Sequence, residues 1–107
     1  MQLRSIERAG SLYEWDERKN AENLLKHGLS FDDAHSVFSG PCLTFEDTRF
    51  DYDEERYITF GFLKSRLVVI AHTPRGEDTR IISMRKANSR EKEVHQKRSQ
   101  ADRRDEG

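Results

Sequence analysis

Cationic side chains and one histidine recur in the C-terminal part of the chain, where strand-like segments alternate with turns. They are His72, Arg75, Arg80, Arg85, Lys86 and Arg90. The guanidinium of arginine stays charged and donates two parallel hydrogen bonds to a pair of phosphate oxygens. The imidazole of histidine gains and loses a proton near neutral pH. Cleavage of a phosphodiester without a metal is one reaction that uses these groups, because a base, an acid and cationic donors must meet at one phosphate.

The expected catalytic group has one histidine and two arginines. We expect His72 to end a strand beside a turn and to act there as acid or base. Arg80 and Arg85 would stabilise the charge that develops on the phosphate. Each residue also has a structural interpretation. A histidine at a strand end is often a solvated surface residue, and the arginines could pair with Asp16 or with the acids at 46–55.

Three further cations are expected to bind RNA phosphates around that group. Arg75 lies in a turn with Pro74 and Gly76, while Lys86 and Arg90 follow the last strand. Lys86 could instead cap the following helix or be merely solvated.

Strand alternation sets a condition on the two catalytic arginines. Successive side chains of a strand point to opposite faces, so Arg80 and Arg85 should point to opposite faces of a strand over 79–85. Both can serve one surface only if a bulge interrupts the strand or if Arg80 lies at a sheet edge.

Charge is divided unevenly along the chain, although the formal net charge is only −1. Residues 1–63 contain 7 Lys/Arg and 13 Asp/Glu, whereas residues 64–107 contain 12 and 7. This asymmetry is typical of a protein with a nucleic-acid face on one side and a different partner on the other. Two solvated faces of opposite charge are the alternative. The acidic connection at 46–55 could likewise meet a basic segment of a partner or be a solvated loop.

Length and composition exclude several classes of protein. With 107 residues, 34% of them hydrophobic and 36% charged, the chain has room for one small core. The single cysteine, Cys42, excludes an intramolecular disulfide and a multi-cysteine zinc site. The four histidines have no metal-ligand spacing, so we expect neither metal nor cofactor. No apolar run approaches the roughly 20 residues of a membrane span and no secretory signal opens the chain, so we expect a cytoplasmic protein without membrane contact.

Helix signals precede most strand signals along the chain. The expected helices are at 17–27, between Asp16 as N-cap and Gly28 as terminator, from Ser30 to about residue 38, and at 89–98. The expected strands are a short one at 12–15, then 42–45, 56–62, 67–71 and 79–85. We therefore expect an α+β fold, with two N-terminal helices, an antiparallel β-sheet meander and a C-terminal helix.

Three blocks of sequence, in this order, resemble the BrnT family of toxins. The first reads WDERKN at 15–20, then Asn23-Leu24, then KHGLSF at 26–31. The second is Glu55-Arg56-Tyr57 before a strand, and the third is RIISMRKA at 80–87, followed by Arg90-Glu91. The resemblance extends from about Leu12 to about His95. Met84 is a mild departure, because a small residue is common there in the family.

The resemblance implies a RelE-like fold and a ribonuclease activity that arrests translation. It also implies neutralisation by a BrnA-type antitoxin with a ribbon-helix-helix DNA-binding domain, so that the toxin meets operator DNA only through the antitoxin complex. The expected toxin domain is then 12–98, with 1–11 as an N-terminal extension and 99–107 as a polar, disordered tail.

Two other functions remain open at this stage. A non-catalytic binding module could act as co-repressor with a DNA-binding partner, which the lean core and the weakly apolar last helix would suit. A degenerate toxin could fold and bind its antitoxin without cutting RNA. An assay of RNA cleavage by the antitoxin-free protein separates a ribonuclease from both.

Overall fold

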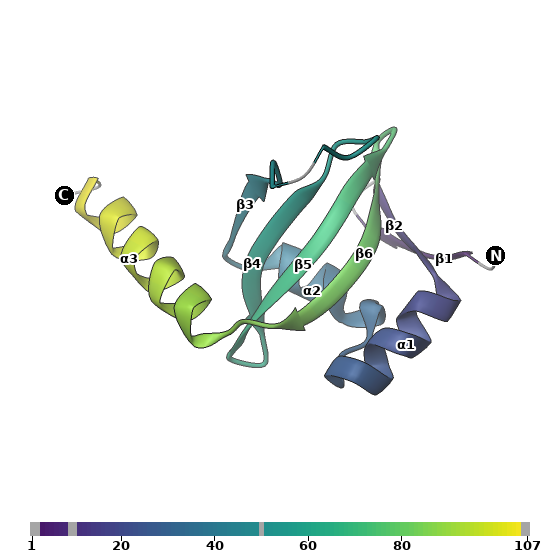
Figure 1. The fold of residues 1–107 in the computed structure, drawn as a ribbon, viewed down its shortest axis with the longest axis horizontal. Helices are drawn as coiled ribbons and strands as arrows, with labels where there is room; N and C mark the ends of the chain where they lie inside the picture. Colours follow the sequence, from purple (N-terminus) through teal and green to yellow (C-terminus); the bar gives the residue numbers. More distant parts are fainter. Residues whose placement is uncertain (1–2, 9–10, 50, 106–107) are drawn as a thin grey trace.

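The computed structural model describes residues 3–8, 11–49 and 51–105, and the side chains of 13–49 and 51–99 (Figure 1). The strands are β1 (Leu3–Arg8), β2 (Ser11–Asp16), β3 (Cys42–Glu46), β4 (Tyr57–Leu63), β5 (Arg66–Arg75) and β6 (Asp78–Lys86). The helices are α1 (Glu17–His27), α2 (Ala34–Ser39) and α3 (Ser89–Asp105), with a 3-10 turn at Phe31–Asp33 before α2. The expected mixture of helices and strands is confirmed.

The six strands form one mixed sheet in the order β1-β2-β6-β5-β4-β3. Strands β3 to β6 are the expected antiparallel meander. However, β2 pairs with β6 in parallel, and β1 pairs with β2 in an antiparallel hairpin. The expected order is therefore only roughly matched: two helices do precede the meander, but this hairpin comes before them. Its strand β1 lies in the segment that was expected to be an extension outside the domain.

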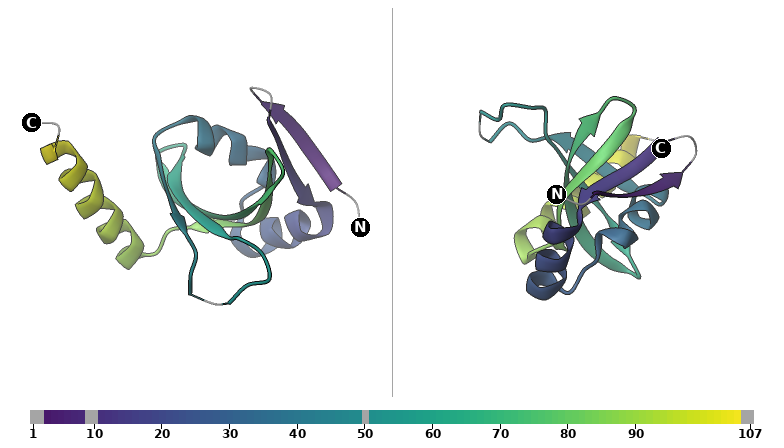
Figure 2. Two further views of the ribbon diagram at one scale, coloured as in Figure 1. Left: turned by 90° about the horizontal axis from the view of Figure 1, so that it is seen from above. Right: turned by 90° about the vertical axis from the view of Figure 1, so that its right-hand side faces the viewer.

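Helices α1 and α2 cover one face of the sheet, which curves around α2 (Figure 2). We call this the inner face and its opposite the outer face. Burial of apolar side chains between the inner face and these helices makes the main core. The buried members of that core are Trp15, Leu29, Phe31, Ala34, Val37, Val68, Ile70, Ile81 and Met84. A smaller cluster on the outer face contains Leu67, Val69, Ala87 and the half-buried Ile58 and Phe60.

Helix α1 begins and ends where its capping residues predict. The carboxylate of Asp16 accepts a hydrogen bond from the N–H of Arg18 at 2.9 Å, which satisfies one of the free donors of the first turn. Gly28 ends the helix in the left-handed conformation, with φ of 70°, and its N–H donates to the carbonyl of Leu24. Both expectations for this helix are confirmed.

Two buried asparagines connect α1 to the rest of the fold. Asn20 accepts a hydrogen bond from the N–H of Phe31 at 2.8 Å. Asn23 donates to the carbonyls of Leu29 and Met84, and it accepts from the N–H of Met84. Strand β2 covers β6 only near its start, so the side chain of Asn23 satisfies the backbone of β6 farther along. These asparagines of the first family-like block are therefore structural residues.

Gly61 of β4 lets α2 approach the sheet closely. A Cβ added at this position would lie 2.5 Å from Cγ1 of Val37, and Val37 is fully buried. A β-branched side chain in a helix has one strongly preferred rotamer, so Val37 cannot rotate away. We expect Gly61→Ala to lower the free energy of unfolding by about 1–3 kcal/mol in urea denaturation. Gly40→Ala is the control, because its added Cβ stays 3.9 Å from the nearest atom; equal losses for the two variants would contradict this account.

Helix α3 stands apart from α1 and α2, on the side of the sheet where β3 and β4 lie (Figures 1 and 2). It was expected to end near residue 98 and to be followed by a disordered tail at 99–107. Instead it continues to Asp105, and 106–107 lie outside the described residues. The polar composition of this segment suggested disorder, but Arg, Lys, Gln and Ala are also strong helix formers. Within the described parts of the chain, no helix is long and apolar enough to cross a membrane.

Candidate functional site

A β-bulge in β6 brings the two predicted catalytic arginines to the same face of the sheet. Val69 of β5 pairs with Arg85, and Thr73 of β5 pairs with Arg80. The register shifts between these two pairs, which leaves Ile82 as an additional residue in β6. Val69 and Thr73 lie four positions apart in an uninterrupted strand and so share the outer face. Their cross-strand partners, Arg80 and Arg85, share it with them.

The burial of neighbouring residues in β6 agrees with this bulge. Ile81 and Met84 are three positions apart, and a regular strand would send them to opposite faces. Both are nevertheless buried in the inner core, at 1% and 0% exposure. The bulge therefore meets the condition that strand alternation placed on Arg80 and Arg85.

Arg85 is held in position by the start of α3. Its Nη1 and Nη2 donate to the two carboxylate oxygens of Glu91 at 2.7 and 2.8 Å. Glu91 and Asn88 cap the helix reciprocally, each accepting a hydrogen bond from the backbone N–H of the other. Hydrogen bonding from Arg85 lowers the pKa of Glu91, and the same bond raises the pKa of Arg85. The partner of Arg85 is thus Glu91, and neither Asp16 nor the acidic connection.

The acidic connection between β3 and β4 contributes a third arginine, which the sequence analysis missed. Arg49 donates to the carboxylate of Asp47 through Nε at 2.8 Å and Nη2 at 3.0 Å, and the hydroxyl of Tyr52 donates to the same carboxylate. The hydrogen bonds from Arg49 hold the pKa of Asp47 far below its usual range. The side chain of Arg49 stays 64% exposed, and its positive charge acts against the rise in the pKa of Arg85.

The predicted phosphate-binding residues lie along the β5–β6 hairpin and not at one point. Arg75 ends β5 and forms an exposed ion pair with Glu54 at 2.8 Å. Lys86 ends β6 at the opposite end of the hairpin, and Arg90 lies in the first turn of α3. From Asp78, the partner of Arg75, to Lys86 the strand extends about 25 Å, at roughly 3.3 Å per residue. Lys86 pairs with Val68, whose side chain lies in the inner core, so strand alternation directs Lys86 toward the inner face and away from Arg80 and Arg85. Arg75 and Lys86 therefore do not bind the same phosphate.

His72 lies on the inner face, separated by the sheet from Arg80 and Arg85. The expectation that it ends its strand is wrong, because β5 continues to Arg75. His72 is 8% exposed, and its Nε2 lies 2.7 Å from the hydroxyl of Thr59. Its ring packs edge-on to the ring of Phe38, with 5.0 Å between the ring centroids, and is stacked on the ring of Tyr57, with 6.0 Å between the centroids.

Burial makes His72 a pH-sensitive element of the fold. It lowers the pKa of His72 from 6.5 to about 4, so the unfolded chain binds this proton more readily than the folded one. Stability from this residue is thus present above about pH 6.5 and lost as the pH falls toward 4, by up to about 3 kcal/mol.

We therefore expect the wild-type free energy of unfolding to fall more steeply than that of His72→Gln over this pH range. Urea denaturation of both proteins at a series of pH values measures how the free energy of unfolding depends on pH. Parallel pH dependences for the two proteins would contradict the assignment.

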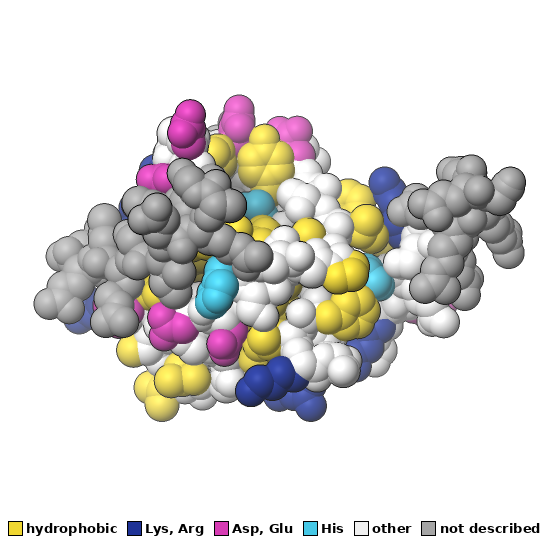
Figure 3. Space-filling model, turned by 180° about the vertical axis from the view of Figure 1, so that it is seen from behind, with side chains coloured by type: hydrophobic (Ala, Val, Ile, Leu, Met, Phe, Trp, Pro, Cys, Tyr) yellow, Lys and Arg dark blue, Asp and Glu magenta, His cyan; other side chains and the backbone are white. Residues whose placement is uncertain are grey.

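Charged side chains form several groups on the inner-face side, and acidic side chains lie both at the top and at the lower left of that view (Figure 3). Acidic side chains gather at the top of that view, around the β3–β4 connection, where the exposed acids are Asp51, Asp53, Glu54 and Glu55. Lys and Arg side chains gather at the bottom, around the β4–β5 turn, where Lys64 and Arg66 are exposed. The positive charge of the arginine site on the outer face is distinct from both. Among the described side chains, no three His, Cys, Asp or Glu lie together as metal ligands.

Comparison with known families identifies the chain. A family described as "Ribonuclease toxin, BrnT, of type II toxin-antitoxin system" matches residues 15–91. This range begins at the buried Trp15 and ends at Glu91, and it includes both arginines of the outer face. A search of curated proteins gives no match. The family match covers well over half of the chain, which therefore belongs to the BrnT family of ribonuclease toxins of type II toxin–antitoxin systems.

Proposed function

We propose that the outer face of β5 and β6 binds RNA and cleaves it without a metal ion. The observation that carries this proposal is the bulge in β6, which gathers Arg80 and Arg85 on one face. Together these residues supply the positive charge that a divalent cation supplies in other nucleases. His72 has no direct part in the proposed reaction, because it is buried on the other face.

The proposed reaction is attack of a ribose 2′-hydroxyl on the neighbouring phosphate. The P–O bond to the 2′-oxygen forms while the bond to the 5′-oxygen breaks; water takes up the proton of the 2′-hydroxyl and returns a proton to the 5′-oxygen. The products are a 2′,3′-cyclic phosphate and a free 5′-hydroxyl. Negative charge builds on the non-bridging oxygens as the five-coordinate phosphorus forms. Arginine donors aimed at those oxygens stabilise that charge more than they stabilise the ground state, and this difference accelerates the reaction.

The biological part of the proposal follows from membership of the family. We infer that cleavage of cytoplasmic RNA arrests translation and that the toxin domain has a RelE-like fold. A BrnA-type antitoxin with a ribbon-helix-helix domain would neutralise the toxin, and operator DNA would be bound only through that complex. The cations at Arg75 and Arg90 would bind phosphates on either side of the cleaved bond. Lys86 would reach such a phosphate only around the end of β6, because its pairing with Val68 directs it toward the inner face.

A non-catalytic co-repressor is the competing function, and one observation favours it. Both terminal nitrogens of Arg85 are engaged by Glu91, so a phosphate has to compete with a carboxylate for this guanidinium. A guanidinium has five N–H donors, however, and the bonds to Glu91 leave others available for a phosphate oxygen.

Incubation of RNA with the folded, antitoxin-free protein tests the proposal. We expect fragments with 2′,3′-cyclic phosphate or 3′-phosphate ends, in equal amounts with and without EDTA. Cleavage that EDTA abolishes would contradict metal independence. Intact RNA at a stoichiometric concentration of folded protein would support the co-repressor or degenerate-toxin alternative and reject ribonuclease activity.

A further inference from the structure

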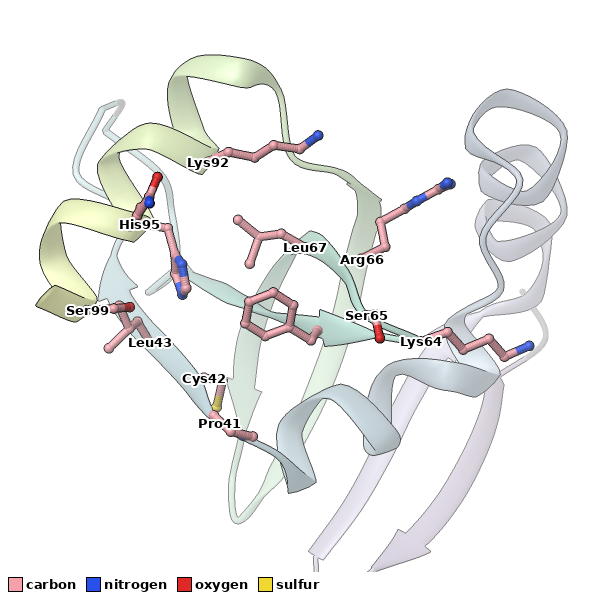
Figure 4. Close-up of a pocket in the computed structure, with 12 residues that line it drawn as sticks. Pro41, Cys42, Leu43, Lys64, Ser65, Arg66, Leu67, Lys92, His95 and Ser99 are labelled. Atoms are coloured by element: carbon pink, nitrogen blue, oxygen red, sulfur yellow. The ribbon is translucent and has the colours of Figure 1, made fainter.

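A groove lies between α3 and the sheet, next to β3, β4 and the β4–β5 turn (Figure 4). We propose that this groove binds an acidic, amphipathic helix of the antitoxin. This inference rests on the proposed function in one respect, the existence of an antitoxin partner. The groove shares the outer face with the pair of proposed catalytic arginines, and Lys92 directly follows Glu91, the partner of Arg85. None of the residues that line the groove is one of the proposed catalytic or phosphate-binding residues, so the two proposals can fail separately.

The groove is large and has an apolar floor. It encloses about 980 Å³ and is lined by Pro41, Cys42, Leu43, Phe62, Lys64, Ser65, Arg66, Leu67, Lys92, His95, Gln96 and Ser99. In Figure 4, Leu43 and Leu67 lie within it, while His95 projects from α3 toward the strands. A helix about 10 Å wide that rises 5.4 Å per turn would fill this volume with about two turns.

Two described side chains of helix α3, those of His95 and Arg98, contact aromatic rings of the sheet beside the groove. The ring centroid of His95 lies 6.5 Å from that of Phe60 and 5.5 Å from that of Phe62. The guanidinium carbon of Arg98 lies 4.9 Å from the ring centroid of Phe45. Phe62 remains 43% exposed. A large exposed aromatic ring beside a cavity marks a surface that another molecule can cover.

Charge identifies the kind of occupant. Three cationic side chains line the groove, Lys64 and Arg66 from the β4–β5 turn and Lys92 from α3. In Figure 4 the charged ends of Arg66 and Lys92 extend on the same side of the groove. None of the described residues that line it is Asp or Glu. An apolar floor with a cationic rim is complementary to a helix with an apolar stripe and acidic flanks.

A helix from a second copy of this chain suits the groove less well than an acidic amphipathic helix does. Leu24 and Leu25 of α1 are 51% and 90% exposed, which gives this helix an apolar surface. However, α1 has three Lys/Arg and two Asp/Glu, so a second copy would bring further positive charge to the cationic rim. RNA is the alternative occupant, because Phe62 and His95 offer rings on which a base could stack. The aliphatic side chains of Pro41, Leu43 and Leu67 favour the apolar stripe of a helix, and RNA cleavage by the variants below distinguishes the two occupants.

Charge reversal at the rim tests the proposal. The probe is a fluorescein-labelled synthetic helix of about 16 residues, with leucines at i, i+3, i+4 and i+7 and flanking glutamates. We expect the double variant Arg66→Glu/Lys92→Glu to bind this probe about tenfold or more weakly than wild type in fluorescence anisotropy. The matched control is Arg18→Glu/Lys26→Glu on α1, which makes the same change in net charge and should bind as wild type does. A probe with lysine in place of every glutamate should not bind.

Two further binding measurements test whether the apolar floor contributes to affinity and whether the antitoxin itself uses the groove. Phe62→Ala should weaken binding of the peptide. Leu25→Ala, which truncates an exposed side chain of α1, should not. Isothermal titration with a cognate antitoxin should show the same loss for Arg66→Glu/Lys92→Glu. Equal affinity of this variant and the wild type for either the peptide or the antitoxin would overturn the proposal.

RNA cleavage by the same variants separates this inference from the proposed ribonuclease function. We expect Arg66→Glu/Lys92→Glu to cleave RNA as fast as wild type. Loss of RNA cleavage with unchanged binding of the peptide would make the groove an RNA site and would overturn the inference. If neither the wild type nor any variant cleaves RNA, but the peptide and the antitoxin bind as expected, the ribonuclease proposal fails and the docking proposal stands.

Discussion

Replacing Arg80 and Arg85 together by alanine is expected to reduce the rate of RNA cleavage by about 1000-fold or more. Removal of one donor that stabilises transition-state charge typically costs roughly 100- to 1000-fold. Single-turnover cleavage of a labelled RNA by the antitoxin-free protein measures the rate. Each single variant should lose about 100-fold, because the bulge in β6 places both guanidinium groups on the outer face.

Two controls separate loss of chemistry from loss of structure. Arg18→Ala removes an exposed cation on α1 and should cleave at the wild-type rate. Arg85→Lys retains the charge but loses the two parallel hydrogen bonds, so its rate should resemble that of Arg85→Ala if geometry matters. The ion pair with Glu91 is partly exposed and should contribute little to stability, so the variants should unfold cooperatively. Near wild-type cleavage by the folded double variant would contradict the assignment.

Replacing Asn23 by alanine is expected to lower the free energy of unfolding by about 4 kcal/mol. Asn23 is 7% exposed and makes three hydrogen bonds, one to the carbonyl of Leu29 and two to the backbone of Met84. Its removal leaves these buried backbone groups without partners, at a cost of roughly 1–3 kcal/mol each. Small domains have only about 5–15 kcal/mol of stability, so this loss is a large fraction of the total.

Urea denaturation of a graded pair of variants checks this role. Asn23→Asp keeps the acceptor for the N–H of Met84 but loses both donated bonds, so it should also unfold more easily than wild type. Asn88→Ala is the comparison at an exposed helix cap, where the loss should be about 1 kcal/mol. Similar losses for Asn23→Ala and Asn88→Ala would show that Asn23 does not connect α1 to β6.

Local signals in the sequence predicted the ends of helices and the centre of the sheet. Asp16 and Gly28 bound α1 as their capping preferences indicate, and Asn88 with Glu91 caps α3 reciprocally. The continuous apolar run at 67–71 is the middle of β5, and Val68 and Ile70 from it lie in the main core. Each of these features depends on residues within a few positions of one another, and so can be predicted without tertiary structure.

The arrangement of the site could not be predicted because it depends on pairing between strands. An additional residue such as Ile82 is invisible until β6 is placed against β5, and simple alternation then assigns Arg80 and Arg85 to opposite faces. The misplacement of His72 has a similar origin. Pro74 and Gly76 indicated a turn from residue 73, but the strand ladder continues to the pairing of Arg75 with Asp78.

Arg49 was missed for a different reason. It stands alone among acidic residues, where its charge suggests only a solvated loop. A weak signal was present in the spacing Asp47-Thr48-Arg49, which suits an aspartate that accepts hydrogen bonds from the backbone and side chain two residues later. Whether such an arginine reaches a catalytic face depends on how the connection folds back, which the local sequence does not encode.

Chemical protection of arginines by RNA tests the central claim most directly, because it reports contact without a mutation. The protein is treated with phenylglyoxal, with and without a 2′-O-methyl RNA that cannot be cleaved, and the modified arginines are located by mass spectrometry. The account predicts that RNA protects Arg80 and Arg85 on the outer face, while Arg18 on α1 and Arg66 at the groove stay reactive. Protection of Arg18 or Arg66, with Arg80 and Arg85 still reactive, would contradict it.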